Sequence, residues 1–139
     1  MTLQNIGPKR VLVVEDDRAL AELIALRLGV WHFDIRVAEN GKIALDQIRD
    51  FRPEAMILDL NMPVLDGFGV LEALGPEQLA KLPTLVLTAR HRAEDVRKAI
   101  SLGARDYLAK PFDQDRFMAR VARLFRKAPV TSIQQVVEL

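Results

Sequence analysis

Short apolar runs alternate along this chain with stretches in which apolar residues recur every three or four positions. Continuous apolar runs are typical of parallel strands buried on both faces, and the periodic stretches are typical of helices that cover such a sheet. The alternation predicts a doubly wound α/β domain with a five-stranded parallel sheet and five helices. The runs that we assign to strands are Val11–Val14, Phe33–Ala38 near the sheet edge, Ala55–Asp59, Thr84–Thr88 and Tyr107–Ala109.

The first three helices are bounded by capping and turn residues. We expect the first to have Asp17 as its N-cap, to stop at Gly29 and to bury the apolar residues Leu20, Leu23, Ile24 and Leu28. Asn40-Gly41 and Asp66-Gly67 are interpreted as turn formers ahead of the second and third helices. The third helix is expected to end near Gly75-Pro76, with a short turn over residues 77–81.

The last two helices carry clear apolar stripes. The fourth places Val96, Ala99, Ile100 and Gly103 on one face, and the fifth begins at Asp113 and buries Phe117, Val121, Leu124 and Phe125. Residues 128–139 lie outside the alternation. Their weak capping box and short apolar stripe fit a docking helix, an oligomer contact, a linker or a frayed terminus.

Composition narrows the function classes. The chain has 139 residues, a net charge of +1, two histidines and no cysteine. Disulfides, thiolate catalysis and cysteine-ligated metals are therefore excluded, and a histidine-rich metal site is not expected because His32 and His91 have no partner spacing. No apolar segment has the length of a signal peptide or a membrane span, so a cytoplasmic location is expected, without a membrane partner.

Polar residues follow the predicted strands at the edge where parallel strands end. The first run is followed by Glu15-Asp16-Asp17, the third ends in Asp59, the fourth ends in Thr88-Ala89, and the fifth is followed by Lys110-Pro111. Because the carboxyl ends of parallel strands lie along one edge, an acid cluster, a hydroxyl and a lysine are expected to converge there. Asp17 is interpreted as a helix cap rather than a member of the cluster.

The three remaining carboxylates, Glu15, Asp16 and Asp59, would repel one another unless they take up a proton or a divalent cation. Oxygen ligands with few protein donors favour Mg²⁺. We expect Asp16 and Asp59 to bind it directly, Glu15 through water, and the main-chain carbonyl of Asn61 to be a further ligand. Asp59 can then attack a phosphoryl group as a carboxylate nucleophile.

The other strand-end residues suit the same chemistry. Lys110 supplies a positive charge to a phosphoryl oxygen or, at rest, to Asp59, and the Thr88 hydroxyl can donate to another phosphoryl oxygen. Ala89 is small and leaves room for the phosphoryl group to enter.

These motifs resemble the receiver domain of two-component response regulators. The resemblance covers about residues 9–127 and rests on the segments Val13–Asp17, Asp59–Gly67, Thr88-Ala89 and Gly103–Phe112. It implies a CheY-like (flavodoxin-like) fold with strand order 2-1-3-4-5, an N-terminal extension over residues 1–9, a receiver over 10–127 and a tail over 128–139. It also implies that Lys110-Pro111 is a cis peptide bond.

The family's function gives each motif a role. Asp59 would be the phosphoacceptor for a sensor histidine kinase or a histidine phosphotransfer protein, with Mg²⁺ bound by the acid pair Glu15 and Asp16. Thr88 and Lys110 would sense the phosphoryl group, and Tyr107 would turn inward. The face formed by the fourth helix, fifth strand and fifth helix would then bind a downstream protein. The chain would be a monomer or a weak phosphorylation-dependent dimer without direct DNA binding, and not an enzyme, because it turns over no external substrate.

Two features depart from common receivers. Asn61 and Arg90 flank the expected path of the hydrolytic water, and an arginine there predicts a longer-lived phosphorylated form. Arg116, Arg120, Arg123 and Lys127 form a basic stripe on the fifth helix, whereas receivers tied to winged-helix DNA-binding domains usually pair through alternating acids and bases on this face. The stripe is interpreted first as a solvated basic face and second as a docking surface for an acidic partner or a nucleotide second messenger.

Three other interpretations compete with a stand-alone receiver. A phosphohydrolase with an aspartyl-phosphate intermediate typically has a second acid two residues after the nucleophile, and Asn61 argues against it. A flavodoxin-like nucleotide or flavin binder would need a glycine-rich loop after the first strand, where acids stand instead. A receiver excised from a longer protein, with residues 128–139 as a linker, stays open.

Overall fold

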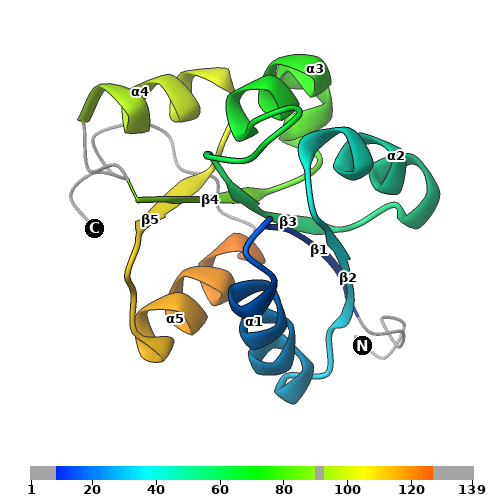
Figure 1. Cartoon of the computed structure of the whole chain (residues 1–139), viewed down its shortest axis with the longest axis vertical. Coiled ribbons are helices and arrows are strands. Elements are labelled where there is room, and N and C mark those ends of the chain that lie inside the picture. The colour runs from blue at the N-terminus through cyan, green and yellow to red at the C-terminus, as the bar shows by residue number, and fades with distance from the viewer. Residues whose placement is uncertain (1–8, 90–92, 127–139) are drawn as a thin grey trace.

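The computed structural model describes residues 9–89 and 93–126 of the chain. Within these residues, five strands and five helices alternate, as the sequence pattern predicts (Figure 1). The strands are β1 (Arg10–Val14), β2 (Asp34–Ala38), β3 (Ala55–Asp59), β4 (Thr84–Thr88) and β5 (Asp106–Ala109). The helices are α1 (Arg18–Val30), α2 (Gly41–Phe51), α3 (Gly67–Ala80), α4 (Ala93–Leu102) and α5 (Gln114–Leu124).

All strand pairs are parallel, and the order is β2-β1-β3-β4-β5. The predicted fold and strand order are thus confirmed. Helices α2, α3 and α4 cover one face of the sheet, and α1 and α5 cover the other (Figure 1). Alternate residues of β1 enter the two cores: Leu12 and Val14 face α2–α4, whereas Val11 and Val13 face α1 and α5. Burial on both faces explains why the central strands are continuously apolar.

Side-chain caps fix the start of four helices. Asp17, Asn40, Asp66 and Asp113 each accept a hydrogen bond from the backbone N–H three residues further on. Each such cap stabilises its helix by about 1 kcal/mol. The prediction for Asp17 is therefore confirmed. Asn40-Gly41 and Asp66-Gly67, predicted as turn formers, are instead the N-cap and first residue of α2 and α3.

The first helix differs from its prediction in two ways. It continues through Gly29 to Val30, with Trp31 as C-cap. Its buried residues are Ala21, Ile24 and Leu28, while Leu23 lies on the outer side and is 46% exposed. The helix carries apolar residues all round, so spacing alone did not distinguish the buried side.

The later helices follow the sequence more closely. Gly75 has a non-helical backbone that interrupts α3, which confirms the predicted break before a short final turn. In α5, Phe117, Val121 and Leu124 are buried as expected, while Phe125 is half-buried and stacks on Phe33 with ring centroids 5.2 Å apart.

Of the two histidines, only His32 lies among the described residues. His32 lies on the surface as expected, whereas His91 and residues 128–139 lie outside the described residues. Within the described ranges, no helix combines the length and the apolar character that crossing a membrane requires.

Candidate functional site

The strand register places the predicted acids side by side. Val14 of β1 pairs with Leu58 of β3, so Glu15 and Asp59, one residue further along each strand, come level at the sheet edge. A carboxylate oxygen from each of Glu15, Asp16 and Asp59 lies within 4.8 Å of the others. Glu15 and Asp59 are each only 2% exposed, whereas Asp16 is exposed to solvent. The three residues form the acid cluster.

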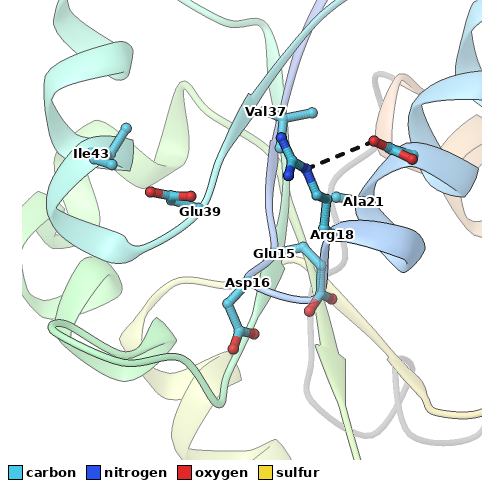
Figure 2. A pocket seen from close by; sticks show the side chains of 8 residues that line it. Glu15, Asp16, Arg18, Ala21, Val37, Glu39 and Ile43 are labelled. Atoms are coloured by element: carbon cyan, nitrogen blue, oxygen red, sulfur yellow. Dashed lines mark ion pairs between the residues drawn. The ribbon is translucent and has the colours of Figure 1, made fainter.

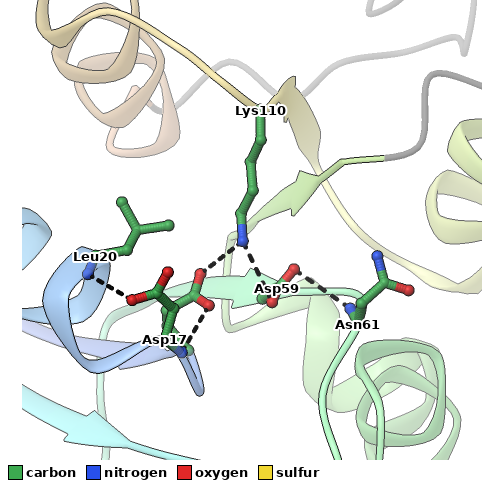
Figure 3. Close-up of polar contacts among 6 residues, drawn as sticks. Asp17, Leu20, Asp59, Asn61 and Lys110 are labelled. Atoms are coloured by element: carbon green, nitrogen blue, oxygen red, sulfur yellow. Dashed lines mark hydrogen bonds and ion pairs between the residues drawn. The ribbon is translucent and has the colours of Figure 1, made fainter.

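Lys110 joins the two buried acids of the cluster (Figure 3). Its Nζ lies 3.0 Å from Glu15 Oε1 and 3.4 Å from Asp59 Oδ2. Backbone N–H groups complete the arrangement: that of Asp17 donates to Glu15 Oε2 (3.2 Å), and that of Asn61 donates to Asp59 Oδ1 (3.3 Å). Among the described residues, Lys110 is the one cation paired with this cluster of three carboxylates, which therefore carries excess negative charge.

The charge distribution shifts two pKa values. Burial raises the pKa of Glu15 to about 7, with a further upward contribution from the Asp59 charge, against the hydrogen bond from Lys110. Burial by itself lowers the pKa of Lys110, but its hydrogen bond to Glu15 and the charges of Asp59 and Glu15 outweigh burial and raise it. Lys110 is therefore a fixed positive charge at neutral pH, and Glu15 is close to its midpoint.

The donor set fits a divalent cation. Hard carboxylate oxygens grouped at this separation, with excess negative charge, are the ligands that Mg²⁺ prefers. The acid cluster also opens to solvent on the side of α1 and α2, where Glu15 and Asp16 line a pocket of about 530 Å³ together with Arg18, Glu22 and Glu39 (Figure 2). Arg18 Nε lies 3.9 Å from Glu22 Oε2 there, on an exposed surface.

The backbone beyond Asp59 is held by close packing. Gly67 begins α3 and donates its N–H to the carbonyl of Leu60 at 3.1 Å. A Cβ at position 67 would lie 2.6 Å from the carbonyl oxygen of Asp59, a separation that real Cβ atoms do not show. Glycine at this position therefore lets α3 approach the loop that carries Asp59 and Asn61.

Thr88 comes from β4, the strand beside the acceptor strand β3, and Tyr107 comes from β5, the next strand outward. Asp59 pairs with Leu87, so Thr88 lies one residue beyond it on β4, and Thr88 pairs with Ala109 of β5. Thr88 is buried, and Tyr107 is half-buried. Thr88 therefore lies between the acceptor strand and β5, the outer strand of the sheet that carries Tyr107.

Four further predictions for the site concern Asn61, Ala89, Arg90 and the Lys110-Pro111 peptide bond. Ala89 and Asn61 are exposed at the sheet edge, and the Lys110-Pro111 peptide bond is cis, which confirms that prediction. Arg90 lies outside the described residues.

The basic stripe of α5 is not the solvated face that the sequence predicts. Arg120 is 7% exposed, and its Nη1 lies 3.1 Å from Oδ1 of Asp106, which is also buried. Arg123 pairs with the other oxygen of the same carboxylate. Arg120 also donates to the carbonyl of Tyr107, and its guanidinium lies 5.7 Å from the centre of the Tyr107 ring. Only Arg116 of the described stripe is exposed.

The sequence pattern gives no signal for the role of Asp106. Its acid directly precedes Tyr107, but its two arginine partners lie 14 and 17 residues further on, at a distance where spacing gives no signal of contact. The helical spacing of Arg120 and Arg123 indicated only that they share a face of α5.

Comparisons with known proteins agree with this geometry. The family model described as "Response regulator receiver domain" matches residues 11–122. The chain is 41% identical over 123 residues to "Response regulator MprA" of Mycolicibacterium vanbaalenii, an alignment that covers 86% of this chain and 52% of the relative. The chain thus spans about half the length of the curated relatives it matches.

Solved structures show the same fold. The signal receiver domain of a response regulator from Bermanella marisrubri is 37% identical with a TM-score of 0.77, covering 86% of this chain and 100% of that one. Chemotaxis protein CheY4 of Vibrio cholerae is 27% identical with a TM-score of 0.80, at coverages of 86% and 100%. From its sequence motifs, its strand order and these matches, the chain belongs to the response regulator receiver domain family.

Proposed function

We propose that Asp59 accepts a phosphoryl group from a phosphohistidine of a sensor histidine kinase or a histidine phosphotransfer protein. The observation that carries this proposal is the placement of a buried carboxylate at the end of β3, held by Lys110 and the Asn61 N–H beside two further acids. A carboxylate oxygen of Asp59 attacks phosphorus, the histidine N–P bond breaks, and an acyl phosphate forms. The donor imidazole keeps the released electron pair and takes up a proton.

The residues of the acid cluster would hold Mg²⁺, with Glu15, Asp16 and Asp59 as its acidic partners and the main-chain carbonyl of Asn61 as a further ligand. The cation neutralises negative charge on the carboxylates and on the phosphoryl oxygens. Lys110 adds a positive charge that is already in position through its contact with Asp59. The Thr88 hydroxyl and the space beside Ala89 serve the incoming phosphoryl group.

The output would arise from the face formed by α4, β5 and α5. Phosphorylation draws Thr88 toward the acceptor and favours an inward position of Tyr107. The ring of Tyr107 now lies against Arg120, which Asp106 holds in place. The inward position therefore requires this contact to change, and the rearrangement reaches the surface of α5. A downstream protein reads that surface, and the chain itself turns over no external substrate.

The donor would dock on the outer side of α1. This helix starts three residues after the acid cluster begins, and its outer side exposes Leu23 (46%), Leu26 (65%) and Val30 (68%). Exposed large apolar residues in a row mark a protein contact. A Leu26→Glu variant is expected to lose transfer from a phosphohistidine protein while keeping transfer from a small phosphodonor. Equal loss of phosphoryl transfer from both donors, or unchanged transfer from both, would show that α1 is not part of the docking surface.

Phosphoramidate, a small donor with a P–N bond, tests the acceptor. Intact mass after incubation with Mg²⁺ is expected to show one added phosphoryl group on the parent, none on Asp59→Asn, and none on the parent in excess EDTA. An unmodified parent at long incubation, or modification of the Asp59→Asn variant to the same extent, would refute the proposal.

A further inference from the structure

A second pocket lies at the edge of the sheet opposite the acid cluster, where the strands begin. It measures about 430 Å³. Among its described lining residues one carboxylate, that of Glu54, faces six basic residues: Lys9, Arg10, Arg52, Lys81, Arg105 and Arg126. We call this site the basic pocket. The whole chain has 20 basic and 19 acidic residues, so six basic residues beside one carboxylate are a local excess of positive charge.

Part of this charge has a structural role. Arg10 Nε donates to the carbonyl oxygens of Phe51 (3.1 Å) and Arg52 (2.9 Å), and both Lys9 and Arg10 lie within 4.0 Å of Glu54 carboxylate oxygens. Lys9 and Arg10 are therefore engaged in holding the start of β1 against the end of α2.

Helix ends account for a further part. Arg52 and Lys81 are the C-caps of α2 and α3, and Arg126 lies two residues beyond the end of α5. Each helix C-terminus contributes roughly half a negative charge, about −1.5 in total for three helices. Six cations against Glu54 and this contribution leave an excess of about +3.5. Neutralising the helix ends thus explains less than half of the charge.

A cation at a helix end can still bind a ligand, because it offsets the helix dipole without forming an ion pair with a carboxylate. Among described residues, Lys81, Arg105 and Arg126 form no ion pair. Arg105, half-buried, precedes β5, and its N–H donates to the carbonyl of Thr84, so its backbone is fixed. Guanidinium groups bind phosphate oxygens in pairs of parallel hydrogen bonds.

The pocket also has an apolar wall, formed by Pro53, Pro83, Leu124 and Phe125. Phe125 is held in place because one face of its ring stacks on Phe33. A rigid apolar surface beside a group of cations matches a ligand that combines a flat ring with phosphate groups. The pocket is open to solvent rather than enclosed, so a ligand here would be held at the surface, with its phosphate groups on the cations.

We propose that the basic pocket binds a nucleoside phosphate, with the phosphate groups at Arg105, Arg126 and Lys81 and the ring against the apolar wall. The site is separate from Asp59 and needs no divalent cation. Its occupancy reports a soluble nucleotide at the opposite end of the domain from the phosphoacceptor.

Isothermal titration calorimetry in EDTA tests this proposal with three probes: ATP, pyrophosphate and adenosine. We expect one saturable site for ATP, weaker binding of pyrophosphate and no binding of adenosine, with affinity that falls as salt rises. Asp59→Asn is expected to bind ATP as the parent does, which separates this site from the acid cluster. Equal affinities for ATP and pyrophosphate would overturn the assignment of the apolar wall to a ring.

A pair of matched variants locates the site. The double variant Arg105→Gln, Arg126→Gln is expected to weaken ATP binding tenfold or more, which corresponds to the loss of roughly one charge-assisted hydrogen bond. Lys42→Gln with Arg97→Gln removes the same charge from exposed positions on α2 and α4 and should change affinity less than twofold. Circular dichroism checks that both pairs are folded. No saturable ATP binding by the parent, or equal weakening by the two pairs, would overturn the proposal.

Discussion

Replacing Glu15 with glutamine should change how the stability of the domain depends on pH. Glu15 is 2% exposed, and burial together with the Asp59 charge raises its pKa from 4.5 to about 7. The folded protein therefore binds this proton more tightly than the unfolded chain does. In the absence of divalent cations, the free energy of unfolding of the parent must fall as pH rises between these two values, and it stays lowered above them.

The magnitude follows from the two pKa values. A difference of about 2.5 pH units, from 4.5 to about 7, corresponds to roughly 3 kcal/mol at 1.36 kcal/mol per unit. Glutamine does not titrate, and its Oε1 can still accept the hydrogen bond from Lys110. The stability of Glu15→Gln relative to the parent should therefore rise by about 3 kcal/mol between pH 4.5 and pH 8.

Urea unfolding in EDTA, followed by circular dichroism at closely spaced pH values, measures this difference. Glu22→Gln is the matched control, because Glu22 is exposed on α1, and its stability relative to the parent should not vary with pH in the same way. Adding Mg²⁺ at pH 8 should stabilise the parent more than Glu15→Gln. A parent-to-variant difference that is constant across pH, or that favours the parent as pH rises, would refute the reasoning.

Three further predictions concern packing. Arg120→Met should lower the free energy of unfolding by about 2 kcal/mol, because it leaves the buried carboxylate of Asp106 with one arginine instead of two. In the same urea titration, Arg116→Met at an exposed position should change the free energy of unfolding by less than about 0.5 kcal/mol. Gly67→Ala should cost about 1–3 kcal/mol and slow phosphorylation by a small donor, because its Cβ meets the main-chain carbonyl of the acceptor; an unchanged rate and stability would contradict the packing described. Ile24→Ala should cost about 2–5 kcal/mol and Leu23→Ala much less, and the reverse order would show that the buried side of α1 is assigned wrongly.

The fold could be predicted from the sequence because each strand is buried on both faces. A residue such as Ile57 has no polar neighbour within its strand until Asp59, so strand and strand end are both visible in the chain. The convergence of Asp59, Glu15 and Lys110 followed from the same rule, since parallel strands end at one edge. Those three side chains do meet, because Lys110 Nζ lies within ion-pair distance of both Glu15 and Asp59.

What the sequence did not reveal depends on contacts between distant segments. Leu23 and Leu28 are equally apolar, and only the sheet beneath α1 decides which is buried. The spacing of Arg120 predicts a member of a solvated basic stripe, whereas in the fold Arg120 pairs with Asp106 of β5. The basic residues of the basic pocket come from the ends of separate strands and helices, so no local sequence pattern predicts the pocket.

The most direct test of the central claim is to locate the phosphoryl group. Borohydride reduces an acyl phosphate to an alcohol, so after phosphorylation with Mg²⁺ the acceptor aspartate becomes homoserine, which tandem mass spectrometry of peptides can place. The account predicts homoserine at Asp59 and at no other aspartate. Homoserine at Asp16 or Asp66, or a phosphorylated protein with no homoserine at all, would contradict it.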